Sequence, residues 1–228
     1  MNFKKNKTIY KKVKGKDLSI NKVCEVGVYL PETSNIIDFI LTDVKTILVE
    51  PYPPAIEAIK EYFKDNNRNI TLHKVAIYDR EGELELSNAE ASTFVSELPS
   101  SPALVNDKYI PDNSKKIKVK CVKFSSIDDG DIDLLSIDTE GSEWYVLQTM
   151  KSRPLVLSIE THGKFYVNPF MNKIKEWTET NNYKIWYKDM SDTVYIRKDI
   201  AKSSLIESLY LLYINFKIKL RRAKKVFY

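Results

Sequence analysis

Short apolar runs alternate with amphipathic segments along most of this chain, and no other feature constrains its fold as strongly. A short apolar run bounded by turn residues is typical of a buried strand, whereas apolar positions three and four apart are typical of a helix. The expected strands cover residues 22–26, 46–50, 70–79, 83–87, 116–124, 132–137, 154–160, 183–189 and 192–198. The expected helices cover residues 36–41, 142–150 and 169–181, and one more runs from the prolines at 51–54 to residue 63.

The order of these elements predicts an α/β fold with a largely parallel sheet and helices on both faces. A short Met-Ser turn separates the last two strands, which are therefore expected to form an antiparallel pair at the end of the sheet. The chain shows no internal repeat and no low-complexity linker. One domain over residues 20–200 therefore accounts for it, preceded by a basic segment 1–19 and followed by a basic amphipathic helix within 201–228.

The net charge of +5 hides an acidic body with two basic ends. Residues 1–16 hold seven lysines, residues 217–228 hold six Lys and Arg, and neither end holds an acid. Residues 17–216 therefore hold 23 bases and all 31 acids. Such a body argues against a nucleic-acid partner, because phosphate contacts need clustered Lys and Arg. The N-terminal lysines are expected to form a solvated tail. The C-terminal helix could lie on a membrane surface, pack on its own domain or contact a second subunit.

No apolar run approaches the roughly 18 residues that a membrane-spanning helix needs. The basic N-terminus also lacks the apolar segment that a secretory signal requires. We therefore expect a cytoplasmic protein.

Polar residues follow the first two expected strands, where an open α/β sheet binds its ligands. Glu25 and Gly27 end the first strand, and a glycine there lets the backbone pass close to a ligand. Glu50 ends the second strand, where the two oxygens of a carboxylate can accept hydrogen bonds from both hydroxyls of a ribose. The alternative for Glu50 is a plain surface acid. Together these positions predict a cofactor that contains a nucleoside.

The spacing of the glycines narrows the choice of cofactor. They lie at positions 15, 27, 82, 130, 141 and 163, so neither a G-x-G-x-x-G turn nor a P-loop occurs. A dinucleotide needs such a turn beside its pyrophosphate, which disfavours an NAD-dependent oxidoreductase. S-adenosylmethionine contains a ribose but no phosphate, and its sulfonium is positive. Acidic residues around a pocket therefore suit this cofactor.

The most informative stretch is IDLLSIDTEGSE at residues 132–143. Asp138 and Glu140 flank the end of a strand, and two positions with this spacing in an extended segment point to the same side. Such a pair can bind a divalent cation, hold the amino group of a methionine moiety or take up a proton. Glu143 is expected to act only as a first-turn acid of the next helix.

The segment IDLLSIDTEGSEWYVLQTM resembles the hallmark segment of FkbM-type methyltransferases, whose pattern is roughly I-D-x-L-K-I-D-x-E-G-x-E-x-x-V-L. The dipeptide Glu50-Pro51, the run VAIYDREGELEL at 75–86 and SIETH at 158–162 also occur in the family's order, so the resemblance covers residues 20–162. It implies a Rossmann-like class I methyltransferase fold and S-adenosylmethionine as the cofactor. It also implies transfer of a methyl group to an oxygen, often a hydroxyl of a sugar or glycan.

By position, the resemblance assigns cofactor binding to one set of residues. They are Glu25, Gly27, Glu50, Pro51, Ala76, Ile77 and Asp138. Ser92 and Thr93 of the polar stretch 88–114 are further candidates for contact with the cofactor. The first family motif, D-x-G-A-N-x-G, is altered here, because Tyr29 replaces its Asn and Pro31 replaces its second Gly. These departures leave open a second hypothesis, a catalytically degenerate module that binds a partner through its basic ends.

Methyl transfer to a hydroxyl requires the acceptor oxygen, the methyl carbon and the sulfur to lie in line, and a nearby base helps to remove the proton. His162 is the candidate base, with Glu160 as its partner or as a contact to the acceptor. Glu140 is the third candidate catalytic residue. The expected acceptor is a sugar, a glycan or another hydroxylated small molecule.

Overall fold

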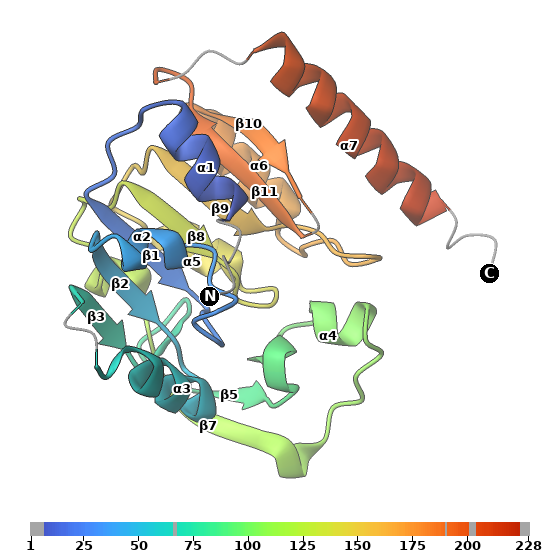
Figure 1. The fold of residues 1–228 in the computed structure, drawn as a ribbon. Coiled ribbons are helices and arrows are strands. Elements are labelled where there is room, and N and C mark those ends of the chain that lie inside the picture. The colour runs from blue at the N-terminus through green and yellow to red at the C-terminus, as the bar shows by residue number, and fades with distance from the viewer. Residues whose placement is uncertain (1–6, 66–67, 190, 201–203, 224–228) are drawn as a thin grey trace, which may run out of the picture.

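The computed structural model describes residues 7–65, 68–189, 191–200 and 204–223. Within them, the larger of two sheets has seven strands in the order β10-β11-β9-β8-β1-β2-β3 (Figure 1). These strands are β1 (Lys22–Val26), β2 (Lys45–Val49), β3 (Ile70–His73), β8 (Leu134–Ile137), β9 (Val156–Glu160), β10 (Tyr183–Lys188) and β11 (Asp192–Arg197). Neighbouring strands are parallel except where β11 runs antiparallel to both β9 and β10. The predicted α/β sheet with an antiparallel edge is confirmed.

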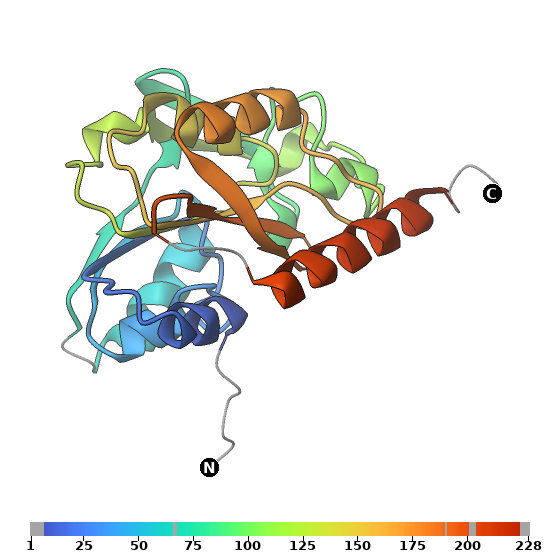
Figure 2. The ribbon, with the colours of Figure 1, turned by 90° about the horizontal axis from the view of Figure 1, so that it is seen from above.

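Helices cover both faces of this sheet, as expected (Figures 1 and 2). On one face lie α1 (Thr8–Gly15), α2 (Ile37–Leu41) and α3 (Pro53–Phe63), and on the other lie α5 (Glu143–Thr149) and α6 (Met171–Thr180). Successive residues of a strand point to opposite faces, so β1 contributes to two hydrophobic cores. Val23 packs with α1, α2 and α3, whereas Cys24 and Val26 pack with α5 and α6. Burial on both faces explains why the central strands are mostly apolar.

A smaller sheet with the order β4-β7-β5-β6 stands beside the larger one. Its strands are β4 (Ala76–Ile77), β5 (Gly82–Ser87), β6 (Phe94–Val95) and β7 (Lys116–Val122). The expectation of one strand over 70–79 is therefore wrong. The backbone leaves the large sheet after His73, and Ala76 and Ile77 pair in parallel with β7. The polar stretch 88–114 contains the short elements η1 (Glu90–Ser92), β6 and α4 (Pro102–Val105). It ends in η2 (Asn113–Lys115), which leads into β7, and η3 (Phe124–Ser126) follows that strand.

The basic N-terminal segment is not a solvated tail in its described part. Thr8–Gly15 forms α1, whose Ile9 and Val13 are buried in the core shared with α2 and α3. These two residues are four positions apart and so lie on one face of the helix, while exposed lysines such as Lys11 and Lys14 lie elsewhere on it. The solvated tail was predicted from the lysines alone, and that prediction did not take the apolar pair into account.

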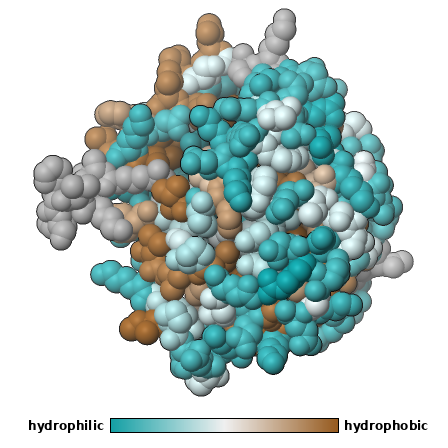
Figure 3. Space-filling view, turned by 180° about the vertical axis from the view of Figure 1, so that it is seen from behind, coloured by the Kyte–Doolittle hydropathy of each residue, from teal (hydrophilic) through white to brown (hydrophobic). Residues whose placement is uncertain are grey.

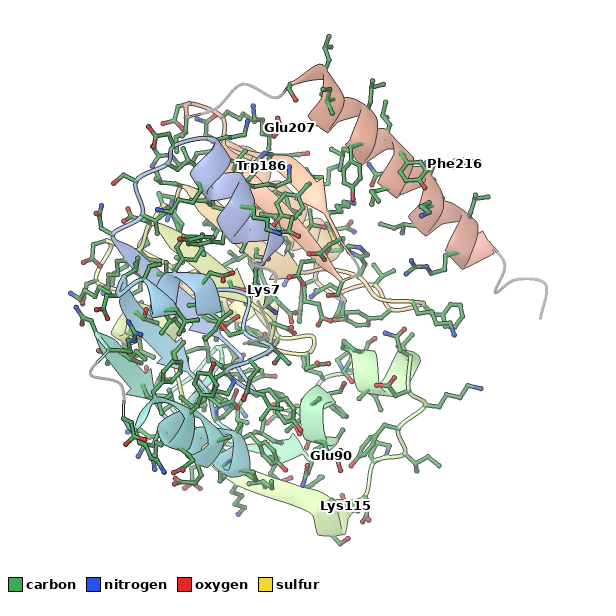
Figure 4. The ribbon with its side chains drawn as sticks, in the orientation of Figure 1. Lys7, Glu90, Lys115, Trp186, Glu207 and Phe216 are labelled. Atoms are coloured by element: carbon green, nitrogen blue, oxygen red, sulfur yellow. The ribbon has the colours of Figure 1, made fainter. Side chains whose placement is uncertain are left out.

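The C-terminal helix α7 (Leu205–Ala223) projects along the outside of the domain from the edge formed by β10 (Figures 1 and 2). Glu207 in its first turn accepts a hydrogen bond from the Trp186 indole (2.6 Å) and lies 3.2 Å from the Lys16 ammonium of α1. Figure 4 shows Trp186 and Glu207 at the start of the helix and Phe216 farther along it. None of the described helices is both long and apolar enough to cross a membrane.

Candidate active site

The carboxyl ends of β1, β2, β8 and β9 meet at one edge of the large sheet. The chain passes from β1 to β2 on one side, whereas β8 pairs with β1 on the other, so the strand order reverses between β1 and β8. A reversal of this kind opens a crevice at the carboxyl edge, where α/β proteins bind their ligands. Gly27, Glu50, Asp138 and Glu160 all lie at this edge, at or just beyond the ends of their strands.

A pocket of about 600 Å³ opens at the same edge, which is a size suited to a small-molecule cofactor. Every residue predicted to bind the cofactor lines it, namely Glu25, Gly27, Glu50, Pro51, Ala76, Ile77 and Asp138. Ser92 and Thr93 line it as well, next to Glu90 of η1, which Figure 4 labels. Of the three predicted catalytic residues, Glu140 lies in the wall of the pocket, while Glu160 and His162 do not.

Glu25 holds the loop that follows β1. Its buried carboxylate accepts hydrogen bonds from the Ser34 hydroxyl (2.5 Å) and from the backbone N–H of Asn35 (2.9 Å). Burial raises the pKa of this carboxyl to about 7. Glu25 therefore fixes the far end of the loop that lines the pocket.

Glu50 is 5% exposed, which excludes the alternative of a plain surface acid. Its Oε2 accepts the backbone N–H groups of Val28 and Tyr29, and its Oε1 accepts that of Tyr52, all at 2.9 Å. A carboxylate can accept about four hydrogen bonds. Glu50 therefore joins the loops after β1 and β2 and keeps room, on Oε1, for one further donor such as a ribose hydroxyl.

Gly27 is the point of closest approach between β1 and β8. Its backbone has φ +82°, and a Cβ atom added there would lie 1.7 Å from the carbonyl oxygen of Asp138. Only glycine fits this position, because any side chain would overlap the backbone of the neighbouring strand end. Tyr29, two residues later, also has a positive φ of 52°, and its N–H is bound by Glu50. The altered motif thus forms a defined loop that leaves the pocket open.

Three carboxylates gather beside the pocket. Asp138, Glu140 and Glu160 each place one oxygen within 4.8 Å of the other two, so the predicted same-side placement of Asp138 and Glu140 is confirmed. Burial, and next the charge of Glu140, raise the pKa of Asp138. Burial, and next the charge of Glu143, raise the pKa of Glu140 to about 8. Burial, and next Asp138, raise the pKa of Glu160. This group of three residues is called the acid cluster below.

The sequence matches the methyltransferase FkbM domain over residues 25–185. The chain belongs to the FkbM methyltransferase family. The match spans the carboxyl ends of β1, β2, β8 and β9 and the acid cluster. S-adenosylmethionine-dependent methyl transfer is the activity class of that family, and the mostly parallel sheet of this chain, with helices on both faces and an antiparallel edge, agrees with the predicted fold.

Solved structures with a similar fold are methyltransferases of low sequence identity. A ribosomal-protein methylase from Lactobacillus delbrueckii subsp. bulgaricus is 11% identical, with 83% of this chain and 76% of that chain covered and a TM-score of 0.43. A SAM-dependent methyltransferase from Aquifex aeolicus is 10% identical, with 84% and 89% covered and a TM-score of 0.42. TYW2 from M. jannaschii, in complex with AdoMet, is 12% identical, with 86% and 78% covered and a TM-score of 0.36. No curated protein sequence matches the chain.

Glu143 has a larger role in this FkbM family member than that of a first-turn acid. It is completely buried, and its Oε1 accepts the backbone N–H groups of Thr139 (2.9 Å) and Gly141 (3.0 Å). Its other oxygen accepts a hydrogen bond from the amide of Asn168. The residue between those two N–H groups, Glu140, has a positive φ of 55°. Glu143 thus stabilises the loop that presents Asp138 and Glu140.

His162 lies beyond the end of β9 and is 3% exposed. Its Nδ1 is 3.0 Å from the Thr161 hydroxyl, which in turn contacts the hydroxyl of Thr193. Because it lies outside the pocket wall, it would have to reach a bound acceptor through another group. Its role as the base stays a prediction.

Asp192 is an acid of the pocket wall that was not among the site residues predicted from the sequence. It is buried in the pocket wall, where its Oδ2 accepts hydrogen bonds from the amide of Asn35 (3.0 Å) and the hydroxyl of Ser158 (3.1 Å). Burial, and next Asp189, raise its pKa to about 7. Because β11 is antiparallel, its first residue rather than its last lies at the carboxyl edge, opposite Glu160. The predicted antiparallel hairpin implies this position for Asp192. The site residues predicted from the sequence, however, all follow or end a strand, whereas Asp192 begins one.

Proposed function

We propose that this FkbM family member binds S-adenosylmethionine in the pocket and transfers its methyl group to an oxygen of a sugar, a glycan or another hydroxylated small molecule. One observation carries the proposal. A buried carboxylate with room for a ribose hydroxyl, Glu50, and an acid cluster suited to a cationic ligand flank the same 600 Å³ pocket.

The lining residues suggest how the cofactor is held. Glu50 would accept a ribose hydroxyl, and Pro51, Ala76 and Ile77 offer apolar surface for the adenine. Gly27 lets the backbone approach the methionine part of the cofactor, and Asp138 lines the same pocket. When bound, S-adenosylmethionine supplies an electrophilic methyl group, whose bond to sulfur breaks as the bond to the acceptor oxygen forms.

The chain's own residues would orient the acceptor. Glu140 lies in the pocket wall, where its carboxyl group can form a hydrogen bond with the acceptor hydroxyl. Acids in the wall, including Asp189 and Asp192, suit a hydroxylated acceptor and disfavour one that is rich in phosphates.

The test supplies tritiated S-adenosylmethionine with monosaccharides, oligosaccharides, hydroxylated aglycones and RNA as separate acceptors. We expect label on a hydroxyl of a carbohydrate or aglycone, with S-adenosylhomocysteine formed in equal amount. Glu140→Gln should lower turnover by about 100-fold, because it removes a carboxyl group that positions the acceptor hydroxyl. Glu57→Gln, at an exposed acid of α3 outside the pocket, is the matched control and should leave turnover nearly unchanged.

Label on RNA alone, or on nitrogen alone, would contradict the proposed acceptor class. Cofactor binding without transfer to any acceptor would favour the degenerate module, the alternative that Tyr29 and Pro31 raise.

A further inference from the structure

We infer that the acid cluster of Asp138, Glu140 and Glu160 binds a divalent cation through oxygen ligands, Mg²⁺ or Mn²⁺, and that this cation holds the acceptor hydroxyl. The second part rests on the proposed function, whereas binding of the cation does not.

The cluster brings together carboxylate oxygens that nothing in the described part of the chain satisfies. Asp138 Oδ1, Glu140 Oε2 and Glu160 Oε2 are buried, and none of the three has a hydrogen-bond partner. Glu160 as a whole is only 6% exposed. A buried carboxylate oxygen without a partner is costly, and the cost is highest where like charges adjoin it. A divalent cation between the three side chains would satisfy all three oxygens at once.

Two hydroxyls next to the cluster give an independent indication of a ligand. Tyr166 is 0% exposed, and its hydroxyl has no hydrogen-bond partner although nearby acids include Glu160 and Glu140. The Thr139 hydroxyl, between two cluster residues, is buried without a partner as well. Hydroxyls normally donate to carboxylates that are within reach. Their vacant hydrogen bonds fit waters that complete the shell of a bound cation.

The supporting contacts hold the cluster in place. Glu143 binds the N–H groups on both sides of Glu140, and the Asn168 amide that contacts Glu143 also donates to the carbonyl oxygen of Glu160 (3.3 Å). The loop after β8 and the end of β9 are therefore tied through one pair of side chains. Such outer contacts orient the ligands of metal sites and are part of their design.

The donor set selects the kind of cation. Carboxylates are hard oxygen ligands, which suit Mg²⁺ and Mn²⁺ and do not favour metals that prefer sulfur or nitrogen. Asp138 and Glu140 line the pocket, so a cation between them would have a coordination position open to the acceptor. Coordination lowers the pKa of a bound hydroxyl. Its proton would leave to solvent through the pocket, and the oxygen would form the bond to the methyl carbon as the carbon–sulfur bond breaks.

The test is titration of Mn²⁺ into the purified full chain, followed by calorimetry and by the electron paramagnetic resonance of free Mn²⁺. We expect one Mn²⁺ per chain, displaced by excess Mg²⁺. Asp138→Asn and Glu160→Gln should each weaken binding by about tenfold or more. Glu57→Gln, outside the pocket, should leave it unchanged. Both cluster variants should fold, because each removes one of three mutually repelling buried acids, and their thermal unfolding verifies this.

No Mn²⁺ binding by the folded wild-type chain, or binding that Asp138→Asn leaves intact, would overturn the inference. A chain that binds S-adenosylmethionine but has no affinity for Mn²⁺ would refute the cation site and leave the proposed function standing. A chain that binds Mn²⁺ but has no affinity for S-adenosylmethionine would support the cation site and contradict the proposed function.

A separate observation concerns α7, whose outer face is apolar and uncovered. Eight of its large apolar residues are 48% to 84% exposed: Leu205, Ile206, Leu209, Tyr210, Leu212, Tyr213, Phe216 and Leu220. Most recur three or four positions apart and so form one stripe along the helix. In Figure 3 the brown, hydrophobic side chains gather along the edge of the molecule where α7 lies. The opposite side, with Leu211, Ile214 and Ile218, is half-buried toward the domain.

The charges around this stripe indicate what covers it. At 100° per residue, Lys217 lies near one edge of the stripe, beside Tyr210, and Lys219 lies just beyond the other edge; both are exposed. Glu207 is the helix's one acid, and it is engaged with Trp186 and Lys16. Lys11 and Lys14 are exposed on α1, whose Lys16 contacts Glu207 in the first turn of α7. A second copy of the same helix would meet like charges, whereas an anionic surface would meet opposite ones.

We propose that α7 lies in the plane of an anionic lipid surface, with its stripe in the apolar layer and its lysines toward the headgroups. The test is cosedimentation of the full chain with vesicles of phosphatidylcholine alone and with added phosphatidylglycerol. Binding should require the anionic lipid. It should fall about tenfold or more in Leu209→Ser/Phe216→Ser and in Lys217→Glu/Lys219→Glu.

The matched control is Lys118→Glu/Lys120→Glu, a charge reversal at two exposed lysines of β7, which should leave binding nearly unchanged. Equal binding to both kinds of vesicle, or none to either, would overturn the proposal. A dimer that forms in solution and dissociates in Leu209→Ser/Phe216→Ser would also overturn it and would assign the stripe to a second copy of the chain.

Discussion

Gly27→Ala is expected to destabilise the fold by at least about 3 kcal/mol, because two separate costs add at this position. The new Cβ would lie 1.7 Å from the carbonyl oxygen of Asp138, so the ends of β1 and β8 must move apart. The alanine must also adopt a φ of +82°, which L-residues avoid. Urea denaturation should show this loss in the free energy of unfolding. For a domain of this size, thermal unfolding should show a fall of roughly 6–12 °C in Tm.

Gly130→Ala separates the two costs. Gly130 has a similar φ of +93° but nothing within 4 Å of an added Cβ, and it lies outside the pocket. Its substitution should cost only about 1 kcal/mol, the cost of the backbone conformation alone. Equal losses in the two variants would mean that the contact between the strand ends is not as tight as the structure places it.

Glu50→Ala is expected to weaken the binding of S-adenosylmethionine by about tenfold to 100-fold. A hydrogen bond to a charged group contributes about 1.5–3 kcal/mol, and Glu50 offers one to the ribose. The substitution also frees the N–H groups of Val28, Tyr29 and Tyr52, so the loop at the pocket should loosen as well. Calorimetric titration measures the first effect, and amide hydrogen exchange over residues 27–31 measures the second.

Glu57→Ala is the control for this prediction. Glu57 is an exposed acid on α3, outside the pocket, and it forms an ion pair with Lys60 on its own helix. Its removal should change neither the cofactor affinity nor the exchange of the loop. If Glu50→Ala binds S-adenosylmethionine as tightly as the wild type does, the ribose cannot lie at the end of β2.

The sequence predicted the fold well where burial sets the pattern. Central strands such as β1 and β9 are buried on both faces, so each is mostly apolar and has an acid at or near its end. The cofactor candidates followed from the same logic, since Glu25, Glu50 and Asp138 directly follow or end such runs. All of them line the pocket.

The errors arose where tertiary contacts override the local pattern. The run 70–79 divides between two sheets, because Ala76 and Ile77 pair with β7, which lies about forty residues later in the chain. Nothing local in the run marks this exchange of partner. In α1 the buried pair Ile9 and Val13 is hidden among lysines, and its burial depends on a core formed by α2 and α3. Asp192 was missed because its place in the site depends on the direction of β11.

The most direct measurement of the central claim is calorimetric titration of S-adenosylmethionine and of S-adenosylhomocysteine into the full chain, first shown to be free of carried-over cofactor. The pocket at the carboxyl ends of β1, β2 and β8 predicts one site per chain with micromolar affinity, about −8 kcal/mol, for both compounds. No heat from either compound with a folded sample would contradict the assignment of this pocket to S-adenosylmethionine.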